Sequence, residues 1–353
     1  MHYRHRLSMV AGIAAGAAFA ALIAPIALSG DAVAQDKSKL RCNSVFPLAS
    51  ALSTPQIRWG EEVEKLSDGR IVTEDLALAL YKAGEAPDGL GGGLADCGSM
   101  NFYYPEVMPV ANDSGSMPFV WNEAMYADWV NIPFVGEVLT EELAGANIVP
   151  LIGAPGAQSF FMLKELPNGS APEDMSRTFE GLRVRTWGIY TEVVKLLGGT
   201  PVAMPANEVP VALRQGLIDG LVTSWDTWKS QGMQEDAPFA YNVPAMGGGM
   251  FGMNKGRWDR FSEDDRALMR KAAVTVAKEV AEGTAAFKQQ VIDEAKANPK
   301  LTVVELTPDE AARWRGALSS IMDGYASRSD KHKQYLDTLT KHFQEGYTPS
   351  WER

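Results

Sequence analysis

The sequence predicts an α/β protein of two lobes that are bridged by one long helix. A strand pattern, a helix pattern and a second strand pattern follow one another near the start, which is the order of a βαβ unit and favours a parallel or mixed sheet. A helical pattern that begins at Ser262 continues almost to Asn298, and at about 1.5 Å per residue it would be roughly 55 Å long, more than one small domain needs. The length of 353 residues also suggests two lobes rather than one compact unit.

Residues 1–34 have the layout of a secretory signal peptide. Two arginines precede an apolar run from Met9 to Leu28, and the A-x-A cleavage site Ala32 to Ala34 comes directly before Gln35. A retained membrane anchor is the alternative, because the run is nearly long enough to span a bilayer. The proline and the small residues near the A-x-A site favour cleavage. We therefore expect a mature chain that starts at Gln35.

Acidic side chains outnumber basic ones. The net charge is −11 at pH 7, and removal of two arginines and one aspartate with residues 1–34 changes it to −12 (−11 − 2 + 1). Such a protein suits neither nucleic acid nor an anionic membrane surface. It can still bind a small anion, because a small ligand responds mainly to the charge of its own site.

The first half of the mature chain predicts alternating strands and helices. Strand patterns at Leu40 to Phe46 and Ile71 to Leu76 enclose a helix that Pro55 opens and Gly69 ends. A glycine run from Gly89 to Gly93 precedes the next strand, whereas a dinucleotide-binding loop follows one, so we expect no cofactor there.

Later helices are marked by their caps and by proline. The pattern from Asn122 to Leu143 contains Pro133, which predicts a kink or two helices. A strand is expected at Ile148 to Ile152. A capping box at Thr307 opens a helix that should reach about Arg328, and a last helix is expected at 331–344.

The two cysteines, Cys42 and Cys97, lie in strand-like segments. In an oxidising compartment they could form a disulfide if the two strands are neighbours, and two buried free thiols are the alternative. The mature chain has no CxxC motif and keeps only His332 and His342, so no metal site is predicted. The same scarcity of histidine disfavours a Ser-His-Asp or Cys-His enzyme.

The segment from Phe179 to Gly220 places one arginine between a strand and a helix. A strand is predicted at 182–185, a helix at 190–197 and a second strand at 201–204; Asn207 then caps another helix, and an apolar run starts at Leu217. Arg185 ends the first strand, where it can bind a carboxylate through two parallel hydrogen bonds. From spacing alone, an ion pair with a neighbouring Asp or Glu is the alternative.

Three motifs in this segment, GLRVR, LGGTPVAMP and NEVPVALRQGLIDG, resemble the solute-binding proteins of tripartite ATP-independent periplasmic (TRAP) transporters. The helix from Pro55 to Leu66 and the G-x-x-D turn from Gly93 to Asp96 resemble the opening part of the same family. The resemblance implies a periplasmic-binding-protein-like fold with the ligand between two lobes, a periplasmic location and a membrane permease as partner. It also implies that Arg185 binds the carboxylate of a small organic acid.

The resemblance implies a division of the chain into two discontinuous lobes. Lobe I would comprise residues 35–154 and 245–290. Lobe II would comprise residues 155–244 and 291–353, including the C-terminal helices. Hinge strands would cross between the lobes near 153–155 and 244–252, and the long helix would make a third crossing.

The chain departs from the family pattern at two places. Many members carry a second arginine in the segment that matches Ala157 to Leu166, where this chain has Gln158. Many also carry an acidic residue and an asparagine after the D-G of the third motif, where this chain reads LVTSW and includes Thr223. Gln158 and Thr223 are therefore predicted site residues, but dicarboxylate or sialic-acid specificity and the metal of keto-acid binders do not carry over.

Aromatic residues complete the predicted site. Trp187 follows Arg185, Trp225 and Trp228 follow the third motif, and Phe102 and Tyr103 follow the strand around Cys97. One cation beside flat apolar walls suits a carboxylate on an aromatic or otherwise apolar body, and core packing is the alternative for each ring. The predicted function is solute binding without a cofactor; a secreted carboxylate-processing enzyme and the ligand-binding subunit of a sensor are the alternatives.

Overall fold

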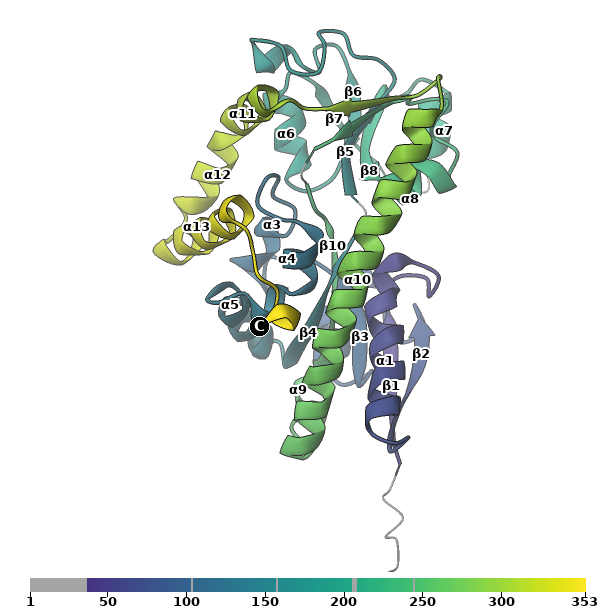
Figure 1. Ribbon diagram of the computed structural model, residues 1–353, viewed down its shortest axis with the longest axis vertical. Coiled ribbons are helices and arrows are strands. Elements are labelled where there is room, and N and C mark those ends of the chain that lie inside the picture. The colour runs from purple at the N-terminus through teal and green to yellow at the C-terminus, as the bar shows by residue number, and fades with distance from the viewer. Residues whose placement is uncertain (1–36, 103, 157, 205–207, 244) are drawn as a thin grey trace, which may run out of the picture. The chain divides into compact units, whose positions relative to one another are not determined.

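The computed structural model describes residues 37–353 except 103, 157, 205–207 and 244 (Figure 1). The predicted signal peptide and the predicted cap Asn207 lie outside the described residues. The described chain forms two β-sheets with helices packed against them. None of its helices is both long and apolar enough to span a membrane.

The first sheet has the strand order β2-β1-β3-β10-β4. The strands β1, β2 and β3 are parallel, and β10 is antiparallel to both β3 and β4. The sheet is therefore mixed, and the predicted βαβ unit at its start is confirmed. Its strands are β1 (Ser38–Ser44), β2 (Ile71–Ala77), β3 (Cys97–Asn101), β4 (Ile148–Pro155) and β10 (Gly248–Asn254).

The second sheet has the strand order β11-β9-β5-β8-β6-β7. The strands β6 and β8 are parallel, as are β6 and β7, so the carboxyl ends of these three strands lie at one edge. The strands are β5 (Gln158–Leu163), β6 (Arg183–Thr186), β7 (Thr200–Ala203), β8 (Gly220–Ser224), β9 (Phe239–Asn242) and β11 (Thr302–Glu305).

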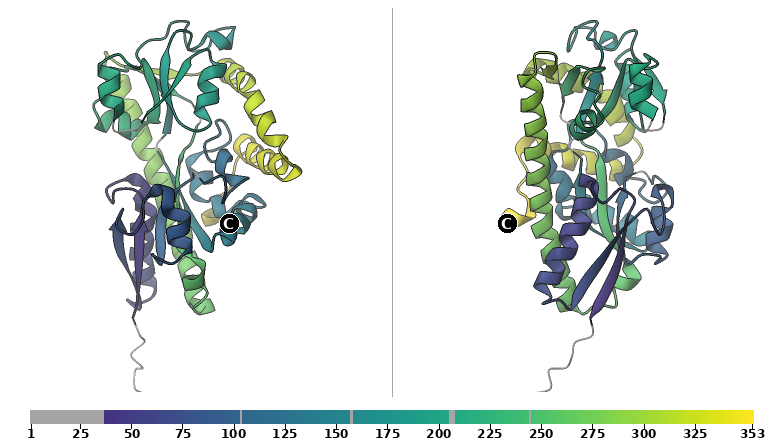
Figure 2. Two further views of the ribbon diagram at one scale, coloured as in Figure 1. Left: turned by 180° about the vertical axis from the view of Figure 1, so that it is seen from behind. Right: turned by 90° about the vertical axis from the view of Figure 1, so that its right-hand side faces the viewer.

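The long helix α10 (Glu263–Ala297) packs against both sheets (Figures 1 and 2). Ser262 caps it by accepting a hydrogen bond from the Asp265 backbone N–H. Its apolar residues from 269 to 281 are buried in one core with strands of the first sheet, whereas Val291, Ile292 and Ala295 are buried with residues of the second sheet. The predicted bridging helix is confirmed.

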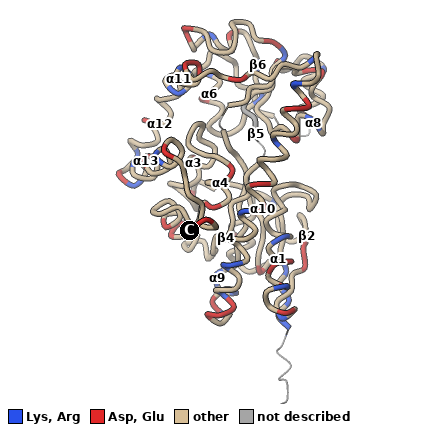
Figure 3. Tube along the Cα trace, viewed as in Figure 1, with Lys and Arg blue, Asp and Glu red and all other residues tan. Residues whose placement is uncertain are grey.

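Charged residues of both signs are interspersed along α10 and along α1 (Thr54–Leu66), as Figure 3 shows. The guanidinium of Arg58 on α1 contacts the carboxylate of Glu279 on α10, with 3.1 Å between Nε and Oε2. Both side chains are nearly half exposed, so this pair adds little to stability. The apolar faces beneath the charges therefore hold these two helices together.

The remaining helices are short. Pro133 separates α4 (Glu123–Ala127) from α5 (Val135–Gly145), as predicted. The glycine run from Gly89 to Gly93 ends α2 (Ala86–Gly91), and a Cβ on Gly91 would lie 2.1 Å from the Ala146 carbonyl oxygen, which explains a glycine there. The others are α3 (Ala111–Ser114), α6 (Tyr190–Leu196), α7 (Val209–Arg214), α8 (Trp225–Ser230) and α9 (Lys255–Trp258).

The C-terminal helices differ from the prediction in two ways. The capping box at Thr307 is present, but the helix is split into α11 (Pro308–Ala317) and α12 (Ser319–Ala326) at Leu318, which is fully buried. The last helices were expected in lobe II, yet Tyr335 of α13 (Asp330–Glu345) is buried in the core of the first sheet. Its hydroxyl accepts a 2.7 Å hydrogen bond from Trp129 Nε1, which fixes α13 there.

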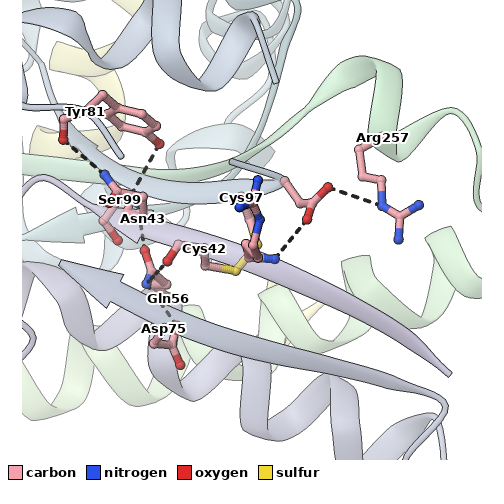
Figure 4. The surroundings of a disulfide bond; sticks show 10 residues. Cys42, Asn43, Gln56, Asp75, Tyr81, Cys97, Ser99 and Arg257 are labelled. Atoms are coloured by element: carbon pink, nitrogen blue, oxygen red, sulfur yellow. Dashed lines mark hydrogen bonds and ion pairs between the residues drawn. A yellow bond between two sulfur atoms is a disulfide. The ribbon is translucent and has the colours of Figure 1, made fainter. Parts of the chain in front are cut away.

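The disulfide alternative for the cysteines is confirmed. Cys42 of β1 and Cys97 of β3 are direct neighbours in the parallel ladder, their Cα atoms are 4.4 Å apart, and a disulfide joins them (Figure 4). Both are completely buried. Beside them, the buried Gln56 donates to Asp75 Oδ1 over 2.9 Å and accepts from the Ser99 backbone N–H over 3.0 Å.

Candidate ligand-binding site

Arg185 lies near the carboxyl end of β6, between β8 and the edge strand β7 of the second sheet. Its backbone is in register with Val202 of β7 and Leu221 of β8. Side chains alternate along the strand, so Val184 and Thr186 are buried on one face while Arg183 and Arg185 share the other. The chain then turns at Gly188, which has a positive φ of 54°, and enters α6. The prediction of an arginine between a strand end and a helix is confirmed.

The ion pair with a neighbouring acidic residue, which was the alternative for Arg185, is formed instead by Arg183. Its Nε lies 2.8 Å from Asp219 Oδ2, and its Nη2 lies 2.9 Å from Asp219 Oδ1, so two parallel hydrogen bonds hold the carboxylate. Hydrogen bonding to Arg183 lowers the pKa of the Asp219 carboxyl. Asp219 is the aspartate of the I-D-G motif, and its carboxylate is thus already bound.

Arg185 has a different environment. Its Nε and Nη2 each contact the Met204 carbonyl oxygen at 3.3 Å, and no carboxylate among the residues that the structure describes lies within ion-pairing distance. Burial lowers the pKa of this guanidinium, although arginine remains protonated at neutral pH. A partly desolvated cation with unused donors favours an anionic partner from outside the chain.

Two further predicted residues reach the same edge of the second sheet. Thr223 is near the carboxyl end of β8, two residues beyond Leu221, and is half-buried. The backbone of Gln158 pairs with Ser224 at the start of the antiparallel strand β5. Backbone register therefore brings Arg185, Thr223 and Gln158 to neighbouring strands; the side chain of Gln158 lies outside what the structure describes.

Trp187 lies two residues beyond Arg185 and contacts Tyr190, which is hydrogen-bonded to the segment before β10. Its half-buried ring makes an edge-to-face contact with Tyr190, with 4.7 Å between ring centroids. The Tyr190 hydroxyl donates a 2.9 Å hydrogen bond to the Met246 carbonyl oxygen, shortly before β10. Tyr190 and the Met204 carbonyl were not predicted as site groups, because their roles depend on contacts between segments that are distant in the sequence.

Comparison with known proteins identifies the family. Residues 53–328 match the model of the bacterial extracellular solute-binding proteins of family 7 (DctP). The chain belongs to this family. A solute-binding protein of Chromohalobacter salexigens is 26% identical over 292 residues, which cover 79% of this chain and 81% of that protein. The members of this family are extracellular solute-binding proteins, so this chain is a binding protein and not an enzyme.

Two solved structures have the same fold. An extracytoplasmic solute receptor of Bordetella pertussis that binds pyroglutamic acid has a TM-score of 0.70 and 18% identity, with 86% of this chain and 99% of that chain covered. A TRAP periplasmic solute-binding protein of Sulfitobacter with bound β-D-galacturonate has a TM-score of 0.68 and 17% identity, with 86% and 100% covered. The two-lobed fold predicted for this DctP protein is thereby confirmed.

Three of the predicted aromatic residues, Phe102, Trp225 and Trp228, are buried in this DctP protein. Phe102 is stacked on Trp129 in the first core, with 4.1 Å between ring centroids, and is 3% exposed. Trp228 is fully buried and donates a 2.9 Å hydrogen bond from Nε1 to the Ala237 carbonyl oxygen. Phe102 and Trp228 are therefore core residues, because both rings are buried and the Trp228 N–H is already hydrogen-bonded. Tyr103 lies outside the described residues.

Trp225 is also fully buried, but its polar atom is not satisfied. The residue follows β8 directly, at the edge that holds Arg185, and its ring packs edge-to-face on Trp228. Its Nε1 has no hydrogen-bond acceptor among the described groups. A buried indole N–H usually has a partner, so this donor is a candidate ligand contact. A cluster of three or more side chains able to hold a metal ion is absent from the described part of the chain.

Proposed function

We propose that this DctP protein captures a small organic acid by its carboxylate in the periplasm and delivers it to the membrane permease of a TRAP transporter. The observation that carries the proposal is the contrast between two neighbouring arginines. Arg183 binds Asp219, whereas Arg185 has only the Met204 carbonyl oxygen as a partner within the described chain. Pyroglutamic acid and galacturonate, the ligands named for the two related structures, both contain a carboxylate.

The proposed mechanism uses the separation of the chain into two sheets. A carboxylate first binds Arg185 on the second sheet. It gains contacts with the first lobe only when the lobes close, so ligand shifts the population toward the closed form. The permease would recognise that form. Trp187, Thr223, Gln158 and Trp225 are the proposed neighbours of the bound acid.

A thermal-shift screen tests the proposed ligand class. Aromatic acids, dicarboxylates and sugar acids would each be added to the mature protein, and a ligand that binds the folded state raises the melting temperature by mass action. Uncharged amides of the acids that score are the matched controls and should give no shift. If the amides stabilise the protein as well as the acids do, carboxylate recognition is wrong.

The substitution Trp225→Phe tests the unpaired indole. It keeps an aromatic ring in the core and removes the N–H, so we expect ligand affinity to fall by the value of one hydrogen bond, about 0.5 to 1.5 kcal/mol. Isothermal titration calorimetry with the acid found in the screen measures the loss. The control is Trp228→Phe, which removes a donor that Ala237 already uses. Trp228→Phe should lower stability and leave ligand affinity unchanged. If Trp228→Phe lowers the affinity and Trp225→Phe does not, Trp225 is not a site residue.

A further inference from the structure

The turn at Pro118-Phe119 has an unfavourable backbone conformation for its sequence. Phe119 has a positive φ of 61°, at a turn position behind a proline where glycine or asparagine is normally found. A bulky residue in this region costs about 1 to 3 kcal/mol, and such strain persists only where other contacts hold it. The strain therefore calls for a compensating contact of the Phe119 side chain.

That compensating contact lies in the other lobe. The flanking residues Met117, Val120 and Trp121 are buried in the core of the first sheet. Phe119 is 2% exposed, and its ring belongs to the core of the second sheet. Adjacent residues of one turn thus contribute to two different cores.

Both sides of this connection are rigidly supported. On the first side, Trp121 Nε1 donates a 2.7 Å hydrogen bond to the Ser114 carbonyl oxygen, and its ring packs on Trp129 with 4.4 Å between centroids. On the second side, the guanidinium of Arg315 on α11 lies over the Phe119 ring, 5.6 Å from its centroid. The next residue toward the start of α11, Trp314, is fully buried in the same core.

The seam beside the turn is hollow. A cavity of about 570 Å³ is lined from the first side by residues that include Asn112 and Ser116, and from the second side by Ile189, directly before α6, and Leu196 at its end. Phe119 therefore joins the two cores close to open space; Ile189, Met322 and Phe343, which are only partly buried, also pack against both cores.

We infer that Phe119 is an anchor between the two lobes, in addition to the strands and the long helix that join them. Its contact with the second core restricts the range of lobe orientations in the ligand-free protein. This role rests on the proposed closure of the lobes. A narrow range of orientations keeps Arg185 and the first lobe in place for the ligand, so Phe119 is a positioning residue and makes no ligand contact itself.

The test measures the distance between the lobes without ligand. Spin labels would be placed on the mature protein at Lys82→Cys and Arg214→Cys, two exposed positions on opposite lobes. Both native cysteines are in the buried disulfide, so labelling is selective. We expect a narrow distance distribution by pulsed electron paramagnetic resonance in the parent protein, and a broader one in Phe119→Gly. Glycine removes the ring and also relieves the backbone strain, which helps this variant to fold.

A matched control separates anchoring from general stability. Phe179 is a fully buried phenylalanine of the second core whose chain neighbours belong to the second lobe. Phe119→Leu and Phe179→Leu should both lower the melting temperature, but only the change at Phe119 should broaden the distribution. Unchanged distributions in both Phe119 variants, or equal broadening by Phe179→Leu, would overturn the inference. Because no ligand is present, a failure of carboxylate binding at Arg185 would not alter this result.

Discussion

Replacing Arg185 with alanine is expected to abolish most ligand binding. The ligand carboxylate would lose its charged hydrogen-bond partner in a partly desolvated site, at a cost of about 2 to 5 kcal/mol. This corresponds to a dissociation constant that is about 30-fold to several thousand-fold higher. Calorimetric titration of the mature protein with the acid found by thermal shift measures the change.

The neighbouring arginine provides the control for this prediction. Arg183→Ala removes a guanidinium from the same strand and face, but Asp219 and not the ligand loses a partner. We expect a lower melting temperature and an affinity close to that of the parent protein. Arg185→Lys should recover only part of the binding, because an ammonium group cannot form the two parallel hydrogen bonds. Equal affinities for Arg185→Ala and the parent protein would refute the proposed site.

The second large effect is expected from loss of the disulfide. Cys42 and Cys97 are separated by 55 residues, and closing a loop of this length stabilises a folded chain by about 4 kcal/mol in the chain-entropy description. The double substitution Cys42→Ala and Cys97→Ala should therefore move the unfolding of the first lobe to a clearly lower denaturant concentration. Unfolding followed by circular dichroism measures this shift.

The disulfide variant should keep its affinity for ligand while it is folded. Arg185 and Thr223 lie in the second sheet and Trp225 directly follows its strand β8, whereas the cysteines join β1 and β3 of the first sheet. The single substitutions serve as the control, since each breaks the same bond and should reproduce the loss of stability. If the double variant unfolds at the parent concentration, the disulfide does not contribute as described.

Much of the fold could be predicted from local patterns. The βαβ start, the bridging helix and the two helices around Pro133 follow from caps, proline positions and hydrophobic periodicity, which act within a few residues. The break at Leu318 could not be predicted in this way. The chain from Thr307 to Arg328 has a helical pattern throughout, and burial of Leu318 in the second core is a tertiary effect.

The site could be predicted only in part. A strand end and the family resemblance were enough to select Arg185, but only the structure shows that Asp219 pairs with Arg183 and that Arg185 has no acidic partner among the described residues. The aromatic residues show the limit more clearly. Trp225 and Trp228 lie three residues apart in the sequence and are both fully buried, but only the Nε1 of Trp228 meets a carbonyl oxygen, which is set by the fold around Ala237.

The docking of α13 beside Trp129 has a consequence for biosynthesis. The hydrogen bond between Trp129 and Tyr335 spans 206 residues, so the core of the first lobe is incomplete until almost the whole chain is available. A chain emerging from the ribosome cannot close this core early.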